Sequence, residues 1–272
     1  MKPASKYSTL RIAIATITVA LFVVQWLVGD FPIWFFATPM NLLVGVLWLT
    51  IVWEGYRRRV SSAIIQYLLS AEATYIVLAI SALIALSLGL QSTPATTSWP
   101  VVGGFIFVQT TLSLVILRGW RNEGGVRWRF LIIHLGLWLA VTSALLGAPD
   151  KEILRVQVGK DPTREAIDER GRKSYLDYEL YLDKFEVEHS ESGTPQMFRA
   201  TVAVDDKMIN IEVNSPYSQR YGEDIYLVSY TADECVLQIV REPWRAVTAL
   251  GIAMLILGAF ILFMQGFKVG ER

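Results

Sequence analysis

The sequence predicts a multi-pass α-helical membrane protein of about six spans, with a small antiparallel β-sheet or sandwich domain outside the cytoplasm, between the fifth and sixth spans. Hydrophobic residues make up 53% of the chain and charged residues only 18%, which is more apolar than an ordinary soluble domain. Several apolar runs reach or approach the roughly 18–20 residues that cross a bilayer as a helix. The charges are also segregated, because residues 149–242 carry 20 acidic and 12 basic side chains, whereas the whole chain carries 25 of each.

Apolar runs predict the six spans at residues 10–28, 40–53, 73–90, 101–117, 130–147 and 247–263. The second is short unless it begins near Phe31, and the third can begin earlier because residues 63–69 are also apolar. The first run is longer than a signal-peptide core and lacks a small-x-small cleavage site, so we expect it to be retained. The expected regions are a five-span part at residues 1–147, a β domain at 148–242, and a last span with its tail at 243–272.

Lysines and arginines predict the orientation, because basic loops are retained on the cytoplasmic side. The N-terminal tail, the connection at residues 57–59 and the connection at residues 118–129 are basic, whereas residues 29–39 and 91–100 contain no basic residue. We therefore expect both termini in the cytoplasm and a location in the inner membrane. The acidic domain at 148–242 would then be periplasmic.

The acidic segment has the pattern of β-strands. Residues 175–188 alternate Leu176, Tyr178, Leu180 and Leu182 with mostly polar residues, the period of a strand with one buried face. Shorter runs rich in Val, Ile, Tyr and Phe follow at 198–204, 208–213, 225–230 and 235–240. The turn motifs SGTP (192–195), VDDK (204–207) and NSP (214–216) separate them.

Several classes of chemistry are not indicated. The single cysteine, Cys235, excludes a disulfide, a CxxC redox site and a thiolate metal cage within the chain, and we expect it to be a small buried strand residue. The sequence contains no phosphate-binding loop, Ser/His/Asp arrangement, zinc spacing or nucleic-acid motif. We assign no catalytic residue and expect no nucleic-acid partner.

His134 is the candidate functional residue. It lies about one helical turn inside the fifth span, and an ionisable residue there is costly and usually has a partner or a task. Phe130, Leu137 and Trp138 are its neighbours at helical spacing, and Gly136 leaves room beside it for a close approach.

Two interpretations of His134 remain open from the residues alone. A neutral imidazole can bind haem iron axially within apolar and aromatic walls, or it can form a hydrogen bond to a neighbouring helix. A haem would also need a second axial ligand. The other histidine, His189, falls in the outer domain beside a turn and is expected to be a surface residue.

From His134 onward, the sequence resembles the ResB/CcsB family, the haem-handling membrane proteins of system II cytochrome c biogenesis. Four ordered blocks carry the resemblance: HLGLWLAVTSALLGAPD (134–150), YLDKFEVEHSESGTPQMFRATVAV (181–204), VNSPYSQRYGEDIYLVSY (213–230) and VLQIVREPWRAVTALGIAMLILGAFILF (236–263). They cover about half of the chain. The first four spans match less clearly, and the chain looks like the compact variety encoded separately from its partner.

The resemblance implies that His134 is one axial ligand to a haem b iron within the membrane, with Phe130, Leu137 and Trp138 as pocket walls. The opposing histidine would come from a ResC/CcsA-type haem-handling membrane protein, whose tryptophan-rich motif is missing from this sequence. The two proteins would carry haem outward for attachment to apocytochrome c. This chain would be non-catalytic alone and a subunit of a haem lyase or synthetase complex.

Two other functions are alternatives. A small-solute transporter would have paired interrupted helices or several converging intramembrane charges, whereas Glu72 is the main candidate for such a charge here. A membrane-anchored sensor or scaffold with an extracytoplasmic binding domain would have a cytoplasmic signalling module, whereas only QGFKVGER follows Phe263-Met264.

Overall fold

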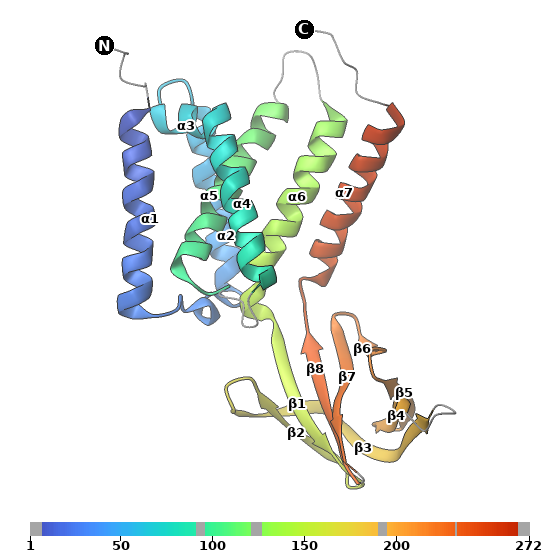
Figure 1. Cartoon of the computed structure of the whole chain (residues 1–272). Coiled ribbons are helices and arrows are strands. Elements are labelled where there is room, and N and C mark those ends of the chain that lie inside the picture. Colours follow the sequence, from blue (N-terminus) through green and yellow to red (C-terminus); the bar gives the residue numbers. More distant parts are fainter. Residues whose placement is uncertain (1–6, 91–95, 121–126, 190–194, 232, 266–272) are drawn as a thin grey trace. The chain divides into compact units, whose positions relative to one another are not determined.

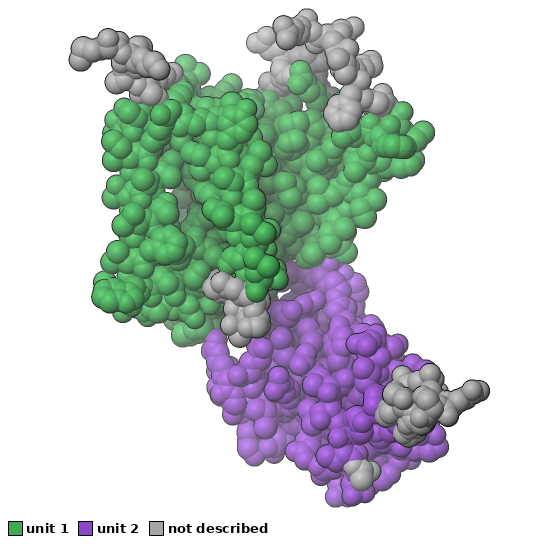
Figure 2. All heavy atoms as spheres, viewed as in Figure 1, with its two compact units in different colours: residues 1–149, 247–272 green, residues 150–246 purple. Residues whose placement is uncertain are grey.

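The computed structural model describes residues 7–90, 96–120, 127–189, 195–231 and 233–265 (Figure 1). The chain forms two compact units, one of residues 1–149 and 247–272 and one of residues 150–246 (Figure 2). The sequence predicts the outer domain at 148–242, and the β unit of the structure comprises residues 150–246. The first unit is helical and the second is a β-sheet.

The helical unit contains seven α-helices and two 3₁₀ turns within the described residues. In chain order they are α1 (Ser8–Val28), η1 (Ile33–Phe36), α2 (Met40–Arg57), α3 (Ala63–Leu68), α4 (Ala71–Leu90), α5 (Trp99–Trp120), α6 (Trp128–Gly147), η2 (Ala148–Asp150) and α7 (Arg245–Gln265).

Four of the described helices are long and apolar enough to cross a membrane: α1, α5, α6 and α7. The expected second and third spans also form helices, α2 and α4, but neither is among the four helices that are both long and apolar enough to cross a membrane. The last turn of α2 carries Glu54 and Arg57. In α4, the apolar stretch within the described residues is Ala71–Ser87. Four of the six expected spans are therefore helices of the length and composition that can cross a membrane.

Helix α5 is the centre of the helical unit, because it contacts α1, α2, α4 and α6. It buries a set of residues that includes Val108, Leu112 and Leu114. Helix α1, by contrast, buries none of its residues and exposes large apolar side chains such as Phe22 and Trp26. Such surfaces are unfavourable in water and compatible with a bilayer.

Helices α6 and α7 are packed backbone to backbone at two glycines. A Cβ atom added to Gly136 would lie 2.8 Å from the carbonyl oxygen of Gly251 and 2.9 Å from Cβ of Met254. A Cβ on Gly251 would lie 2.7 Å from the amide nitrogen of Ala140. The space that the sequence analysis noted beside Gly136 is thus filled by α7, the small-residue packing typical of membrane helices.

The β unit is one eight-stranded sheet in which every neighbouring pair is antiparallel. The spatial order is β5-β4-β3-β2-β1-β8-β7-β6, and β5 also contacts β6 and β7, so the sheet curls until its two edges approach each other. The strands are β1 (Glu152–Val158), β2 (Thr163–Asp168), β3 (Lys173–His189), β4 (Pro195–Val204), β5 (Lys207–Glu212), β6 (Tyr217–Arg220), β7 (Glu223–Tyr230) and β8 (Cys235–Arg241).

The predicted alternation in β3 is confirmed, because Leu176, Tyr178, Leu180 and Leu182 are all buried in the core of the sheet. The four shorter predicted strands correspond to β4, β5, β7 and β8. Strands β1, β2 and β6 are additions to the prediction. The cysteine behaves as expected, because Cys235 is fully buried in the same core.

Two of the predicted turns are present. Asp205 has a φ of 49° between the paired residues Val204 and Lys207, and Asn214 has a φ of 65° after β5. Both residue types tolerate this left-handed conformation. The SGTP motif overlaps residues 190–194, which lie outside the described part of the chain.

The β unit also buries a carboxylate. Glu223 is 1% exposed and accepts hydrogen bonds from the hydroxyl of Tyr178 at 3.0 Å and from Nη2 of Arg220 at 3.0 Å. Its Oε2 atom also accepts from Arg241. A buried charge with this many partners is stable, and removing one partner is costly.

Candidate functional site

The imidazole of His134 is half-buried on α6 and is held by the backbone of its own helix. Its Nδ1 lies 2.8 Å from the carbonyl oxygen of Phe130. Because a carbonyl oxygen can only accept a hydrogen bond, this contact requires the proton to be on Nδ1. In the neutral imidazole Nε2 then carries the lone pair, which is the arrangement that metal-binding histidines use.

Phe130 also fixes the plane of the imidazole. Its ring stacks on the His134 ring with 3.8 Å between the ring centroids and 27° between the planes. The phenyl ring also lies against α5, so closely that a side chain at Gly119 would overlap it. Phe130 therefore holds the histidine by two contacts, one from its carbonyl and one from its ring.

The face of α6 that carries His134 is partly exposed. Helical spacing aligns His134 with Leu137, Val141 and Ala144, and of these Leu137 is 41% exposed and Ala144 is also exposed. The neighbouring faces of the helix are occupied: Gly136 and Ala140 contact α7, whereas Trp138 and Thr142 contact α5. We call the line of residues 134, 137, 141 and 144 the exposed stripe.

The three expected wall residues lie in different surroundings. Phe130 stacks on the imidazole, and Leu137 is on the exposed stripe. Trp138 is turned toward α5 and α2, because its Nε1 donates to Oγ of Ser113 at 2.7 Å and its ring stacks with that of Trp48 at a centroid distance of 6.4 Å. Two of the three, Phe130 and Leu137, therefore lie on the side of α6 that carries His134.

These residues fit one axial position of a haem. Nε2 of His134 offers a nitrogen on an apolar helix face, and histidine is one of the residues that hold haem iron axially. Within the described residues, no group of three or more His, Cys, Asp and Glu side chains could hold a metal ion. His189 ends β3 in the other unit, and the structure does not describe its side chain.

Two acidic residues near helix ends, Glu72 and Glu54, each form an ion pair with arginine side chains. Glu72 of α4 accepts hydrogen bonds from Arg11 of α1 at 2.5 Å and 2.8 Å, a two-pronged ion pair. Glu54 pairs with Arg58 at 2.8 Å and with Arg57 at 3.3 Å. Both carboxylates therefore have local structural partners.

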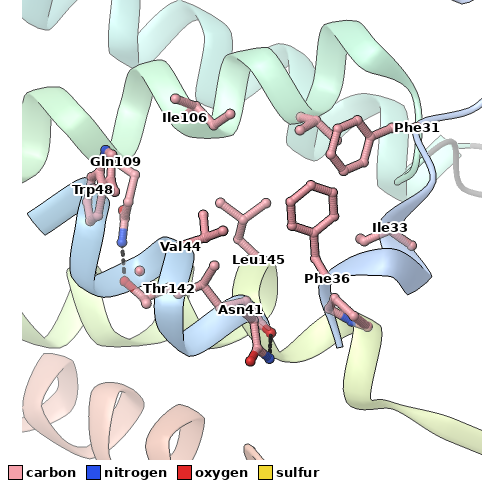
Figure 3. Close-up of a pocket in the computed structure, with 14 residues that line it drawn as sticks. Phe31, Ile33, Phe36, Asn41, Val44, Trp48, Ile106, Gln109, Thr142 and Leu145 are labelled. Carbon is pink, nitrogen blue, oxygen red and sulfur yellow. Dashed lines mark hydrogen bonds between the residues drawn. The ribbon is translucent and has the colours of Figure 1, made fainter. Parts of the chain in front are cut away.

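The helical unit also contains a polar group that was not predicted from the sequence. Gln109 of α5 and Thr142 of α6 line a cavity of about 350 Å³ together with Asn41 of α2, and the remaining lining is apolar (Figure 3). A signal was present in the sequence, because QTT interrupts an apolar run at residues 109–111.

Comparisons with known proteins give a match to a family model and a similar solved structure. Residues 125–236, from just before α6 to the start of β8, match the model of the ResB-like family. Among solved structures, a cytochrome c haem lyase, CcmF, is similar with 11% identity and a TM-score of 0.40 over 82% of this chain. This chain covers 45% of the CcmF chain, and none of the curated proteins matches it. The resemblance to the ResB-like family that the sequence predicted is thereby confirmed for residues 125–236.

Proposed function

We propose that the chain takes part in cytochrome c biogenesis, as a membrane subunit that binds haem b together with a partner and carries it outward for attachment to apocytochrome c. The match of residues 125–236 to the ResB-like family supports the pathway. The observation that carries the role of His134 is the contact between its Nδ1 and the carbonyl oxygen of Phe130. The contact leaves Nε2 as the nitrogen that binds iron.

His134 acts by binding and orienting. A neutral nitrogen ligand adds no charge to an apolar surrounding, where a charged ligand would be expensive to bury. The Phe130 carbonyl keeps the proton on Nδ1 and the Phe130 ring restricts rotation of the imidazole, so Nε2 keeps one direction. When bound, haem supplies the iron porphyrin that the complex attaches to cysteines of apocytochrome c.

The second axial ligand comes from a partner in this proposal. His134 and His189 are the two histidines of the chain, and they lie in different compact units. The exposed stripe, through Leu137 and Ala144, gives a partner helix access to the His134 side of α6. A ResC/CcsA-type protein would approach this stripe and contribute the opposing histidine.

We infer an orientation in the inner membrane with both termini in the cytoplasm and the β domain in the periplasm. The basic connections support it, because lysine and arginine are retained in the cytoplasm. His134 then lies on the cytoplasmic side, where newly made haem arrives. The acidic β domain would position apocytochrome c or the partner outside.

A solute transporter is less well supported. Such a protein needs charges that converge on a shared path. Glu72, the carboxylate that the sequence left open for this role, is neutralised by Arg11. The chain alone has no assigned catalytic residue, so attachment belongs to the complex in this proposal.

Visible spectroscopy of the chain co-purified with its ResC/CcsA-type partner tests the role of His134. We expect His134→Ala to lower the haem content and shift the Soret band, and added imidazole to restore the band by replacing the lost ligand. His189→Ala is the matched control and should leave the spectrum unchanged. Equal yield and equal thermal unfolding of the two variants would separate ligand loss from misfolding.

The proposal is wrong for His134 if His134→Ala retains the haem content and the Soret position of the unmodified complex. It is also wrong in its shared-ligand form if the chain purified without a partner binds one haem with two axial ligands. Phe130→Leu keeps the backbone carbonyl but removes the stacked ring, so it should weaken haem binding by about tenfold, less than His134→Ala does.

A further inference from the structure

Arg127 lies on the same side of α6 as His134. It is the N-cap residue of α6, and its carbonyl oxygen accepts a hydrogen bond from the amide of Leu131 at 3.0 Å, so the first helical turn starts at this residue. Seven residues come within about 20° of two full turns, so Arg127 is almost in line with His134 and about 10 Å nearer the start of the helix. Arg127 thus continues the exposed stripe at its basic end.

The guanidinium of Arg127 is available to a ligand. The residue is exposed, and it has no hydrogen-bond or ion-pair partner among the described residues. Arg118 of α5 differs, because its Nη1 donates to the carbonyl oxygen of Leu69 at 2.8 Å. Arg129 is also exposed, but five residues place it about 140° around α6 from His134. Of these three arginines, Arg127 is the one that is both in line with His134 and not engaged by the protein.

A haem bound to His134 has one favourable direction for its carboxylates. Haem b is apolar except along one edge, which carries two propionates. At the far end of the stripe, Val141 and Ala144 have apolar side chains, and the stripe is flanked by Met254 of α7 and by the Phe130 ring against α5. A carboxylate among these residues would lose its hydration without gaining a partner, which is costly.

The Arg127 end of the stripe supplies a partner for a carboxylate. The Cβ atoms of a helix tilt toward its N-terminus, so the His134 side chain is displaced toward Arg127. Half the width of a porphyrin, its propionate and the long arginine side chain together span the distance of about 10 Å along the helix. A guanidinium binds a carboxylate through two parallel hydrogen bonds. The helix dipole also favours negative charge at this end, where no described side chain caps α6.

We propose that Arg127 binds the propionates of the haem that His134 ligates, and so directs the propionate edge toward the start of α6 and the apolar edge toward Val141 and Ala144. The inference rests on the proposed function, because it takes haem as the ligand of His134. Arg127 forms no bond to the iron. It recognises the carboxylates, and it selects one of the two directions that a haem could take along the helix.

The test compares haem b with its dimethyl ester, in which both propionates are neutral. The full chain, co-purified without haem together with its ResC/CcsA-type partner, is titrated with each probe, and the Soret band gives the two dissociation constants. We expect the unmodified complex to bind haem about tenfold more tightly than the ester, because the ester cannot form the charged hydrogen bonds. Arg127→Gln should remove most of this preference by weakening the binding of haem, while the binding of the ester stays the same.

Arg129→Gln is the matched control, because it removes the same charge from another side of α6 and should keep the preference of the unmodified complex. Arg127→Lys keeps the charge but loses the planar pair of donors, so it should retain part of the preference. The Soret position should be the same in all three variants, since the ligands of the iron are unchanged.

The inference alone is overturned if haem and ester bind the unmodified complex equally, or if Arg127→Gln keeps the full preference, while haem binding still depends on His134. It is also overturned if Arg129→Gln loses as much of the preference as Arg127→Gln, because positive charge in general would then attract the haem. If His134→Ala binds haem as the unmodified complex does, the proposed role of His134 fails, and this inference fails with it.

Discussion

Substituting alanine for Gly136 tests the close packing of α6 on α7. The added Cβ would lie 2.8 Å from the carbonyl oxygen of Gly251, 2.9 Å from Cβ of Met254 and 3.0 Å from the amide nitrogen of Leu255. Two of these three atoms belong to the backbone of α7, so no rotamer change can relieve the overlap. The helices must separate instead.

The size of the effect follows from these distances. An ordinary contact is 3.4 Å or longer, so α7 must move by about 0.6 Å where it crosses Gly136. Overpacking of this kind costs about 1–3 kcal/mol. Alanine gains up to about 1 kcal/mol of helix propensity over glycine, and this gain must be subtracted with a control.

Gly89→Ala supplies the control, because a Cβ at Gly89 meets no atom within 4 Å. We expect Gly136→Ala to unfold at lower denaturant than Gly89→Ala, by about 1–3 kcal/mol, in detergent or nanodiscs. Gly251→Ala should behave like Gly136→Ala, since its Cβ also meets backbone. Equal stability of Gly136→Ala and Gly89→Ala would refute the contact between the two helices.

Three further measurements test the β unit. Tyr178→Phe removes a 3.0 Å hydrogen bond to buried Glu223 and should lower stability by about 1.5–3 kcal/mol in denaturant unfolding, and Glu223→Gln should cost about 3 kcal/mol or more. Burial raises the pKa of Cys235 to about 11, so at pH 8 only about one thiol in a thousand is ionised, and a thiol reagent should label the native chain far more slowly than the unfolded chain. The hydrogen bond from Arg245 lowers the pKa of Asp224. The ionised carboxylate therefore stabilises the folded chain above the unfolded-state pKa of about 3.9, and this stability is lost as the pH falls through the lower pKa of the folded state. Asp224→Asn should make the thermal stability depend less on pH in that acidic range.

Strand prediction succeeds where alternation is long and fails where few side chains are buried. Strand β3 carries a run of alternate buried apolar residues, which the sequence reveals. Strand β2 buries only Ala166, and β6 buries none of its four residues, so neither leaves an apolar pattern. Strand β1 does alternate, with Leu154 and Val156 buried, and its pattern was a missed signal.

Some features of the candidate sites could be predicted from the sequence and others could not. His134 could be found from sequence because an ionisable residue in an apolar run is conspicuous. The close packing of α7 on Gly136 could not be predicted from the sequence, because it depends on which helices become neighbours in the folded protein. Gln109 was visible as a polar residue, but its hydrogen bonds to Trp138 and Thr142 depend on the position of α6.

The glycine contact between α6 and α7 joins segments that are synthesised far apart in time. Ser143 and Thr248, whose hydroxyls are 2.8 Å apart across this contact, are separated by 105 positions in the sequence. Until the ribosome has produced α7, the groove at Gly136 is open to lipid or to another protein's helix. During that interval nascent α6 has a packing surface at Gly136 that the finished protein no longer offers.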